Sequence, residues 1–402
     1  MLKEKFGNFS EKLVKFSGSL SPKAQVIIFL SLFFVLISFF AWLNYTINPY
    51  GVFNHHLNVC DVYDRSCDRE IIYPKIKASR YIDYDYVFCG SSALLTNLSE
   101  ESFERMFPDK TIFKLAVTAV VASEQYDLIK NFIKANPEVK KIFVAVDFDE
   151  MTNSTENQLP EYGENKLNGE ELRFLLLSFE TLKFTLNTVF TTFKEITVPT
   201  FMFSLKRDSF FSKFKIFREY RYKVVTNHNR WPKRRFADWN NRKINQPLFE
   251  HLKKIKELCD EKNVEVVFYT SPLHSYAIYD IYNQNVYNEV ENFKKELVKV
   301  SPFYDFLYVC DYSDKPISVN NKYWNDALHS DKALGDEILN KLVNGKGNYG
   351  IYVTPDNIEK VLKTNREALF AFAKREKKAL DEYVSYGHLD DSCEEEIIYY
   401  EE

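Results

Sequence analysis

The stretch that decides the fold is YDYVFCGSSALLTN, residues 84–97, in which an apolar run ends abruptly in a Gly-Ser-Ser turn. The segment YVFC is β-branched and aromatic, which predicts a short strand buried on both faces of a parallel sheet. Ligands of open α/β sheets bind where the strands end. A serine directly after such a strand lies at that edge, and we expect the following backbone N–H groups to be free to face a developing oxyanion. Ser92 is the candidate nucleophile, and Ser91 is its rival.

A serine nucleophile needs a base, and the base needs a group that orients it. The segment YWNDALHSDKALGDEILNKL, residues 323–342, supplies both. Asp326 and His329 lie three residues apart, just before a run of leucine and isoleucine at helical spacing. Asp326 would hold the imidazole of His329, and His329 would take the proton from Ser92. His274 follows a later predicted strand and is the competing base, or a contact for the acyl donor or acceptor.

The GSS turn on the first strand and the DxxH block before the last helix resemble the SGNH (GDSL-like) hydrolase superfamily. The similarity is to its membrane-anchored branch, which handles acyl groups on envelope polymers and includes the D-alanyl transfer protein of teichoic acid synthesis and polysaccharide O-acetylation proteins. The resemblance spans about residues 84–343. It implies a Ser92-His329-Asp326 triad, with no metal and no cofactor.

The same resemblance implies two oxyanion donors, a glycine after the second strand and an asparagine after the third. The chain has Ala119 at the first position and Asp147, or alternatively Asp149, at the second. The Ala119 backbone N–H could still serve, although the conformational freedom of glycine is lost. A carboxylate at Asp147 would repel an oxyanion unless it were protonated, and Asp147 could instead cap the next segment. These departures count against efficient hydrolysis and less against a transferase.

Strands and helices alternate along the chain. Strands are predicted at residues 86–89, 112–116, 141–147, 264–270 and 306–310. Intervening helices of this length imply right-handed crossovers and a parallel sheet, so the predicted fold class is α/β. The family resemblance adds a flavodoxin-like three-layer sandwich with about five parallel strands.

A membrane span is predicted at residues 26–45, VIIFLSLFFVLISFFAWLNY, which carry no charge and reach the ~20 residues that cross a bilayer. Five lysines precede this run, and no Lys or Arg follows until Arg65, so the positive-inside rule places the N-terminus in the cytoplasm. A cleaved signal peptide is the alternative, but its apolar run is usually only ~7–15 residues long. We therefore expect a retained single-pass anchor, with the later chain at a bacterial cell surface or in a periplasm.

The predicted organisation has five parts. They are a cytoplasmic N-terminus (1–25), a transmembrane helix (26–45), an extracytoplasmic linker (46–83), an SGNH-like domain (84–345) with a basic, aromatic insert (196–245), and a C-terminal helix with an acidic tail (346–402). The linker holds Cys60 and Cys67, which would form a local disulfide outside the cytoplasm or stay as thiols.

The insert interleaves basic and aromatic residues, a mixture that suits a glycan or an anionic polymer. The substrate-binding candidates are Arg230, Trp231, Arg234, Arg235 and Trp239 in the insert, and Trp324 beside the DxxH block. An equally weighted alternative is that the insert forms a basic lid that faces lipid headgroups.

The composition narrows the class of protein. The 402 residues are 45% hydrophobic, which is ample for a core and argues against global disorder. A net charge of -4 gives no general reason to expect nucleic acid as a partner. The leading hypothesis is an O-acyltransferase for an envelope polysaccharide or teichoic acid, with a membrane-bound O-acyltransferase as its partner. The alternatives are an esterase of envelope glycans and a non-catalytic accessory protein.

Overall fold

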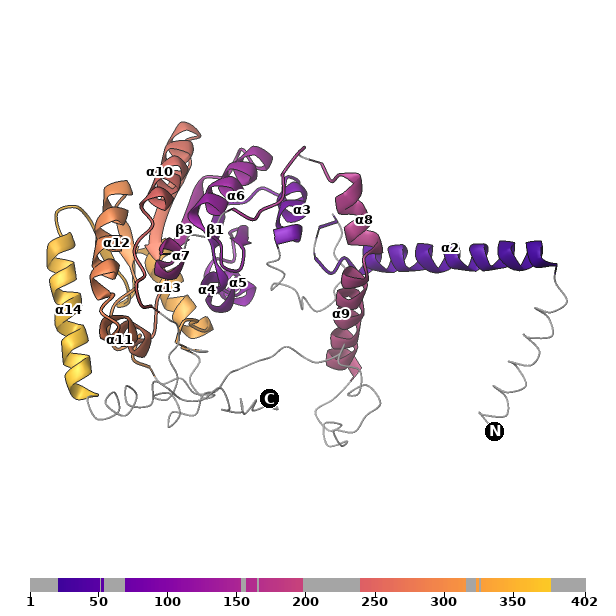
Figure 1. The fold of residues 1–402 in the computed structure, drawn as a ribbon. Helices are drawn as coiled ribbons and strands as arrows, with labels where there is room; N and C mark the ends of the chain where they lie inside the picture. The colour runs from indigo at the N-terminus through magenta and orange to yellow at the C-terminus, as the bar shows by residue number, and fades with distance from the viewer. Residues whose placement is uncertain are drawn as a thin grey trace. The chain divides into compact units, whose positions relative to one another are not determined.

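The computed structural model describes eight stretches of the chain, which Figure 1 draws as a coloured ribbon. They are residues 21–50, 52–53, 69–152, 157–164, 166–197, 239–315, 323–324 and 327–376. The cysteines at positions 60 and 67, most of the predicted insert and the acidic tail therefore lie outside the described residues.

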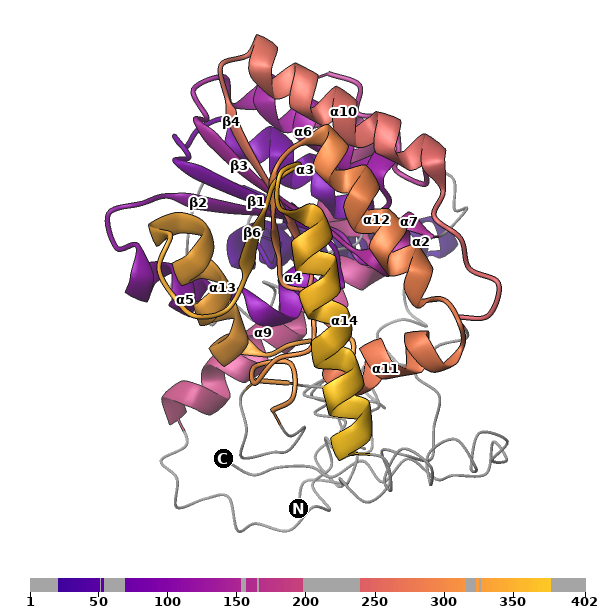
Figure 2. The ribbon, with the colours of Figure 1, turned by 90° about the vertical axis from the view of Figure 1, so that its left-hand side faces the viewer.

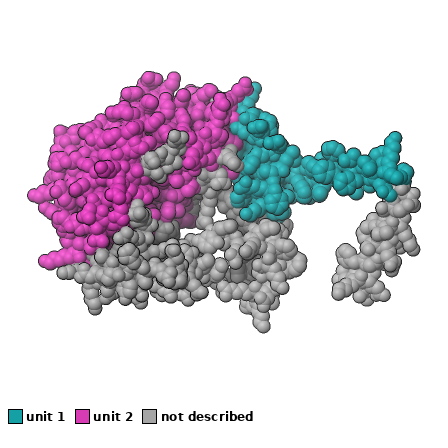
Figure 3. All heavy atoms as spheres, viewed as in Figure 1, with its two compact units in different colours: residues 1–63, 166–218 teal, residues 64–165, 219–402 magenta. Residues whose placement is uncertain are grey.

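The chain divides into two compact units, coloured separately in Figure 3. Unit 1 comprises residues 1–63 and 166–218, and unit 2 comprises residues 64–165 and 219–402. Each unit is therefore continuous in space but interrupted in sequence.

Unit 2 is built on a six-stranded sheet in the order β2-β1-β3-β4-β5-β6, seen edge-on in Figure 2. The strands are β1 (Tyr86–Gly90), β2 (Ile112–Ala116), β3 (Lys141–Val146), β4 (Glu265–Thr270), β5 (Phe303–Asp305) and β6 (Ile351–Val353). The first five pair in parallel, and β6 is antiparallel to β5. The order 2-1-3-4-5 is that of flavodoxin-like folds, whose ligands bind beyond the carboxyl ends of β1 and β3, where the strand order reverses. The α/β fold is thereby confirmed.

Helices cover both faces of the sheet, so each strand is apolar on both sides. In β1, Val87 and Cys89 pack into one core, while Phe88 packs into the other and stacks on Phe143 of β3 at 4.5 Å between ring centroids. The helices of the first core are α3 (Arg69–Ser79), α6 (Ala122–Ala135), α10 (Gln246–Glu261), α12 (Tyr287–Val300) and α14 (Ile358–Arg375). The helices of the second core are α4 (Ser92–Asn97), α5 (Glu100–Met106) and α13 (Lys332–Asn344).

Two short helices complete unit 2 at the ends of the strands. The helix α7 (Phe148–Met151) follows β3, and α11 (Ser275–Asn283) follows β4. Unit 2 also contains α3, which precedes the predicted domain start at residue 84, and both β6 and α14, which follow its predicted end at residue 345.

The predicted fifth strand at residues 306–310 is wrong. The fifth strand is β5, three residues earlier, where Phe303 and Tyr304 pair with β4. After Asp305 the chain leaves the sheet, because the Thr270 hydroxyl accepts the N–H groups of both Phe306 and Leu307. The apolar run that resembled a strand is a buried loop.

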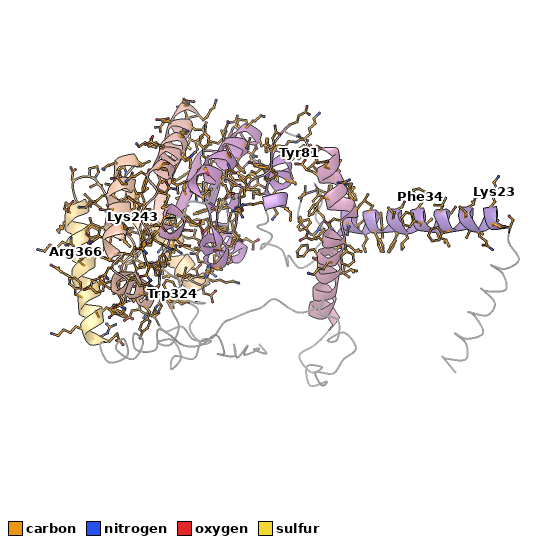
Figure 4. All side chains as sticks on the ribbon, in the orientation of Figure 1. Lys23, Phe34, Tyr81, Lys243, Trp324 and Arg366 are labelled. Carbon is orange, nitrogen blue, oxygen red and sulfur yellow. The ribbon has the colours of Figure 1, made fainter. Side chains whose placement is uncertain are left out.

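Unit 1 contains α2 (Pro22–Ile47), α8 (Gly169–Leu177) and α9 (Phe179–Thr197). The Ser21 hydroxyl caps the start of α2, and Pro22 occupies its first turn, where the missing N–H costs nothing. By length and composition α2 is able to cross a membrane, as a signal sequence would also be. Phe34 projects from its exposed surface in Figure 4.

Candidate active site

The turn after β1 depends on Gly90. A Cβ atom at this position would lie 2.8 Å from the Ala145 Cβ of β3 and 3.0 Å from a methyl group of Leu94 in α4. Only glycine lets strand and helix approach this closely. The chain therefore leaves the sheet abruptly and brings Ser91 and Ser92 to its carboxyl edge.

Ser91 is the cap of α4 and is 3% exposed. Its hydroxyl accepts the N–H of Ala93, and its carbonyl accepts those of Leu94 and Leu95. The expectation that the N–H groups after the turn are free for an oxyanion is therefore wrong for these three residues. Their N–H groups instead bond to Ser91, which satisfies the donors of the first turn of α4.

Ser92, the first residue of α4, is hydrogen-bonded to His329. Its Oγ lies 3.1 Å from Nε2 of the imidazole, although the two residues are 237 positions apart in sequence. Both side chains are only half-buried. The geometry suits proton transfer from the hydroxyl to a neutral imidazole, the first step of nucleophilic catalysis by serine. Asp326, the predicted partner of His329, lies outside the described residues.

The loop that carries His329 is held from two sides. The side-chain amide of Asn97, the last residue of α4, donates to the Ser330 hydroxyl at 3.0 Å. On the other side, the backbone N–H of His274 donates to the Ala327 carbonyl at 3.0 Å. The loop is therefore tied both to the helix of Ser92 and to the end of β4.

Asp147 follows β3 and lies next to the turn that carries Ser91 and Ser92. The Ser91 hydroxyl donates to its Oδ2 atom. Its Oδ1 atom is buried and has no partner at ordinary hydrogen-bond geometry among the described residues. Burial raises the pKa of the Asp147 carboxyl above its usual value, while the hydroxyls of Ser271 and Ser91 and the charge of His329 oppose that rise. The environment thus favours the protonated acid, which can donate a hydrogen bond.

Two further acidic residues belong to this part of the site, because Glu150 interacts electrostatically with both Asp147 and Glu124. Burial, together with the charges of Asp147 and Glu124, raises the pKa of Glu150 in α7 to about 8, and Arg69 opposes the rise. Glu124 is fully buried and pairs with Arg69 of α3 at 2.8 Å. Glu124 and Glu150 therefore share the one guanidinium of Arg69.

Ala119, at the position where the family resemblance implies glycine, lies in the exposed turn after β2. Its φ of 51° is in the left-handed region that favours glycine. Arg69 donates to the Ala119 carbonyl at 3.0 Å and so bridges this turn to Glu124. The turn thus keeps a glycine-like conformation without a glycine.

His274 is 2% exposed and has both ring nitrogens occupied. Its Nδ1 accepts the N–H of Tyr276, so the proton is on Nε2, which donates to the Lys315 carbonyl at 3.0 Å. The competing-base hypothesis therefore does not fit the structure. His274 instead supports the loop of His329 through its backbone.

The two tryptophans proposed to bind substrate are buried in unit 2. Trp239 is 0% exposed and stacks on Phe148, and Trp324 is 1% exposed, with its indole N–H donating to the Tyr312 carbonyl. Figure 4 shows Trp324 within the body of the unit. Neither ring can stack on a sugar, because both are buried against neighbouring side chains. Arg230, Trp231, Arg234 and Arg235 lie outside the described residues.

Several residues around the pair were not predicted. Ser271 could have been inferred, since it directly follows β4 at the same edge. Asn97 and Ser330 could not, because their contact joins segments far apart in sequence. Over the described stretches, no group of three or more His, Cys, Asp or Glu side chains is arranged to hold a metal ion.

Comparisons with known proteins give few matches. No family model and no curated protein matches the chain. Among solved structures, a proposed platelet activating factor from Streptococcus pneumonia is 11% identical and has a TM-score of 0.36, over 69% of this chain and 91% of that one. A proposed acylhydrolase from Bacteroides fragilis is 8% identical with a TM-score of 0.32, over 70% and 95%. At such low TM-scores neither similarity carries an argument about this site.

Proposed function

We propose that this protein is a membrane-anchored O-acyltransferase that carries an acyl group on Ser92 and passes it to a hydroxyl of an envelope polysaccharide or teichoic acid. The observation that carries the proposal is the hydrogen bond between Ser92 Oγ and His329 Nε2 at the carboxyl edge of the sheet. This edge, between β1 and β3, is where flavodoxin-like folds bind their ligands. The order of the motifs, which resembles that of SGNH hydrolases, supports the same assignment.

The first half-reaction forms the acyl-serine. His329 Nε2 takes the proton of Ser92 as Oγ attacks the carbonyl carbon of the acyl donor. The tetrahedral oxyanion then collapses, the bond to the donor oxygen breaks, and the imidazolium returns the proton to that leaving oxygen. Asp326 would orient the imidazole and stabilise its positive charge, in the role that the carboxylate of a triad takes.

The second half-reaction transfers the group. The acceptor hydroxyl gives its proton to His329 and attacks the acyl carbon, and Ser92 Oγ leaves and regains the proton. Balance requires no other reactant. The donor would be an activated acyl ester or thioester, supplied at the membrane by an O-acyltransferase partner.

The oxyanion would be stabilised by the backbone N–H groups of Ser92 and Ala119, and by Asp147 in its protonated form. The left-handed turn at Ala119 and the raised pKa of Asp147 support these roles. A carboxylic acid donates a hydrogen bond only while it is protonated. Asp147 is therefore a weaker oxyanion donor than the asparagine that the family resemblance implies at this position. Slow reaction with water is an advantage for a transferase, since the acyl-serine must survive until the acceptor arrives.

An esterase is the second candidate, in which water replaces the acceptor hydroxyl. It is favoured by the partial exposure of both Ser92 and His329, which leaves the pair accessible to solvent. In either case we propose that α2 is a retained anchor with its N-terminus in the cytoplasm, so that the reaction takes place outside.

The test is the covalent intermediate. The full-length chain in detergent is incubated with an activated acetyl ester, and its intact mass is compared with those of Ser92→Ala and Ser91→Ala. We expect one acetyl adduct on the wild type and on Ser91→Ala, and none on Ser92→Ala. An adduct that survives Ser92→Ala, or none on the wild type, would remove the proposed nucleophile.

Transferase and esterase are then separated by the fate of the adduct. The acetylated protein is freed of excess ester, and loss of the acetyl group is followed by mass with and without a polyol or polysaccharide acceptor. A transferase loses the group slowly in buffer and faster with acceptor, which becomes acetylated. An esterase loses it at the same rate in both.

A further inference from the structure

The exposed surface of α2 continues to its last turns on one side only. Its side chains are largely exposed from Val26 to Phe39, and Trp42 and Tyr45 beyond them are 58% and 48% exposed, whereas Phe40 and Ala41 are half-buried and Asn44 is buried. At ~1.5 Å per residue, the roughly 20 residues from Val26 to Tyr45 span about 30 Å, which is the thickness of the hydrocarbon. The half-covered end of α2 would therefore lie at the outer boundary of the hydrocarbon.

The cover over this end is made by α8 and α9. Figure 1 shows both helices running across the end of α2 rather than alongside it. The Asn44 side chain fixes the junction, because its amide donates to the Leu176 carbonyl at 2.8 Å and its carbonyl accepts the Thr185 hydroxyl at 2.7 Å. Both polar atoms of the amide are thus satisfied within unit 1, as an apolar environment requires.

The contacts of Tyr50 show which side of α9 is covered by protein. Tyr50 follows the end of α2, is 3% exposed and packs against Phe184, with ring centroids 5.5 Å apart. Phe184 therefore faces the interior of unit 1. Phe179 lies five residues earlier, which is about 140° around a helix of 3.6 residues per turn, so it faces away from that interior. Its side chain is 74% exposed.

We propose that α8 and α9 lie in the outer interface of the bilayer that α2 crosses, with Phe179 immersed at the boundary between headgroups and acyl chains. The apolar surface consists of Leu177 and Phe179, and its occupant is lipid, because the adjoining Leu176 is bonded to Asn44 near the end of the span. An amphipathic helix in the plane of the interface and aromatic rings at headgroup depth are both common in membrane proteins. The inference depends on α2 spanning a membrane, as proposed above, but not on the chemistry of Ser92.

The experiment places a photoreactive benzoylphenylalanine at one of three phenylalanines of the full-length chain in phosphatidylcholine–phosphatidylglycerol vesicles. The test position is Phe179. Phe34, which is 63% exposed in the middle of α2, is the control for a lipid-facing residue. Phe370, which is 49% exposed on α14 of unit 2, is the control for an exposed ring outside the span. After irradiation, adducts are identified by intact mass and peptide mapping.

We expect phospholipid adducts at positions 34 and 179, and at least a tenfold lower yield at position 370. Adducts at 34 but not at 179 would overturn the inference, as would a position 179 that crosslinks to protein instead of lipid. Equal yields at 179 and 370 would show unspecific contact and also overturn it. Absence of adducts at 34 would remove the span and this inference together, while leaving the serine adduct as a separate test of the chemistry.

Discussion

Gly335 of α13 packs against the main chain of Asn97, the last residue of α4, so closely that a Cβ atom would lie 1.8 Å from the Asn97 carbonyl oxygen. The same asparagine binds Ser330, the neighbour of His329. The contact therefore sets the separation between the helix of Ser92 and the loop of His329.

Gly335→Ala should destabilise the protein and disturb the pair. The added methyl group meets backbone rather than a flexible side chain, so we expect a loss of about 3 kcal/mol in unfolding free energy, measured with urea. Gly169→Ala is the matched control, because a Cβ there meets nothing within 4 Å. A Gly335→Ala variant as stable as Gly169→Ala would contradict the role of the contact.

His329→Gln should slow acetylation of Ser92. Glutamine cannot act as the base, and removal of general base catalysis typically costs about 10²–10⁴-fold in rate. The rate of adduct formation is measured by mass, with His251→Gln in α10 as the control. Equal rates for the two variants would exclude His329 as the base.

Asp147→Asn should change the pH dependence of acetylation. In the wild type, the raised pKa keeps Asp147 protonated in the lower pH range, and ionisation at higher pH places a negative charge beside the oxyanion. We expect the wild-type rate to fall as pH rises through this pKa, and the variant, which always carries a neutral donor, not to fall. The groups around Asp147 are Ser91, Ser271, His329, Glu150 and Tyr269, all kept in both proteins. Loss of rate at every pH in the variant would instead indicate that Asp147 is needed as a carboxylate.

Glu150 should make the protein less stable as the solution becomes alkaline. Its pKa is about 8 in the folded chain against an ordinary value of 4.5, so between these values the folded state holds a proton that the unfolded state has lost. The unfolding free energy therefore falls as pH rises across that window. Urea unfolding at several pH values should show a flatter dependence for Glu150→Gln. The exposed carboxylate of Glu257, changed to Gln, should leave the slope as it is in the wild type.

Ala119→Gly should stabilise the turn after β2. A left-handed conformation costs an L-residue about 1–2 kcal/mol, and the greater backbone entropy of glycine returns part of the gain. We expect a net increase of about 0.5–1 kcal/mol in unfolding free energy. Ala371→Gly, on an exposed face of α14, should lose about 1 kcal/mol by the ordinary helix penalty. An equal loss of stability in both variants would contradict the left-handed conformation of Ala119.

Four of the six strands could be predicted from sequence, because each is an apolar run bounded by polar or turn residues. The fifth could not be placed, since β5 pairs with β4 only through Phe303 and Tyr304 and the apolar loop after it is equally buried. The sixth, β6, is too short to show a pattern and depends on its pairing with β5.

Within the site, sequence brought Ser92 and His329 together through their motifs, and the structure places them in contact. Their catalytic roles stay predictions. The two tryptophans were misread because an aromatic residue in a polar or basic stretch looks the same in sequence whether it is exposed or buried. The supports of the pair, Asn97 and Gly335, become visible only once α4 and α13 are packed together.

The long sequence separation between Ser92 and His329 also orders events in time. A chain made from its N-terminus presents the serine early and the imidazole only after four more strands of the parallel sheet and the loop before α13 have been synthesised. Until then the hydroxyl has the reactivity of any serine. If Ser92 carries acyl groups as proposed, a chain still being made does not capture them prematurely, and the chemistry begins only when folding is nearly complete.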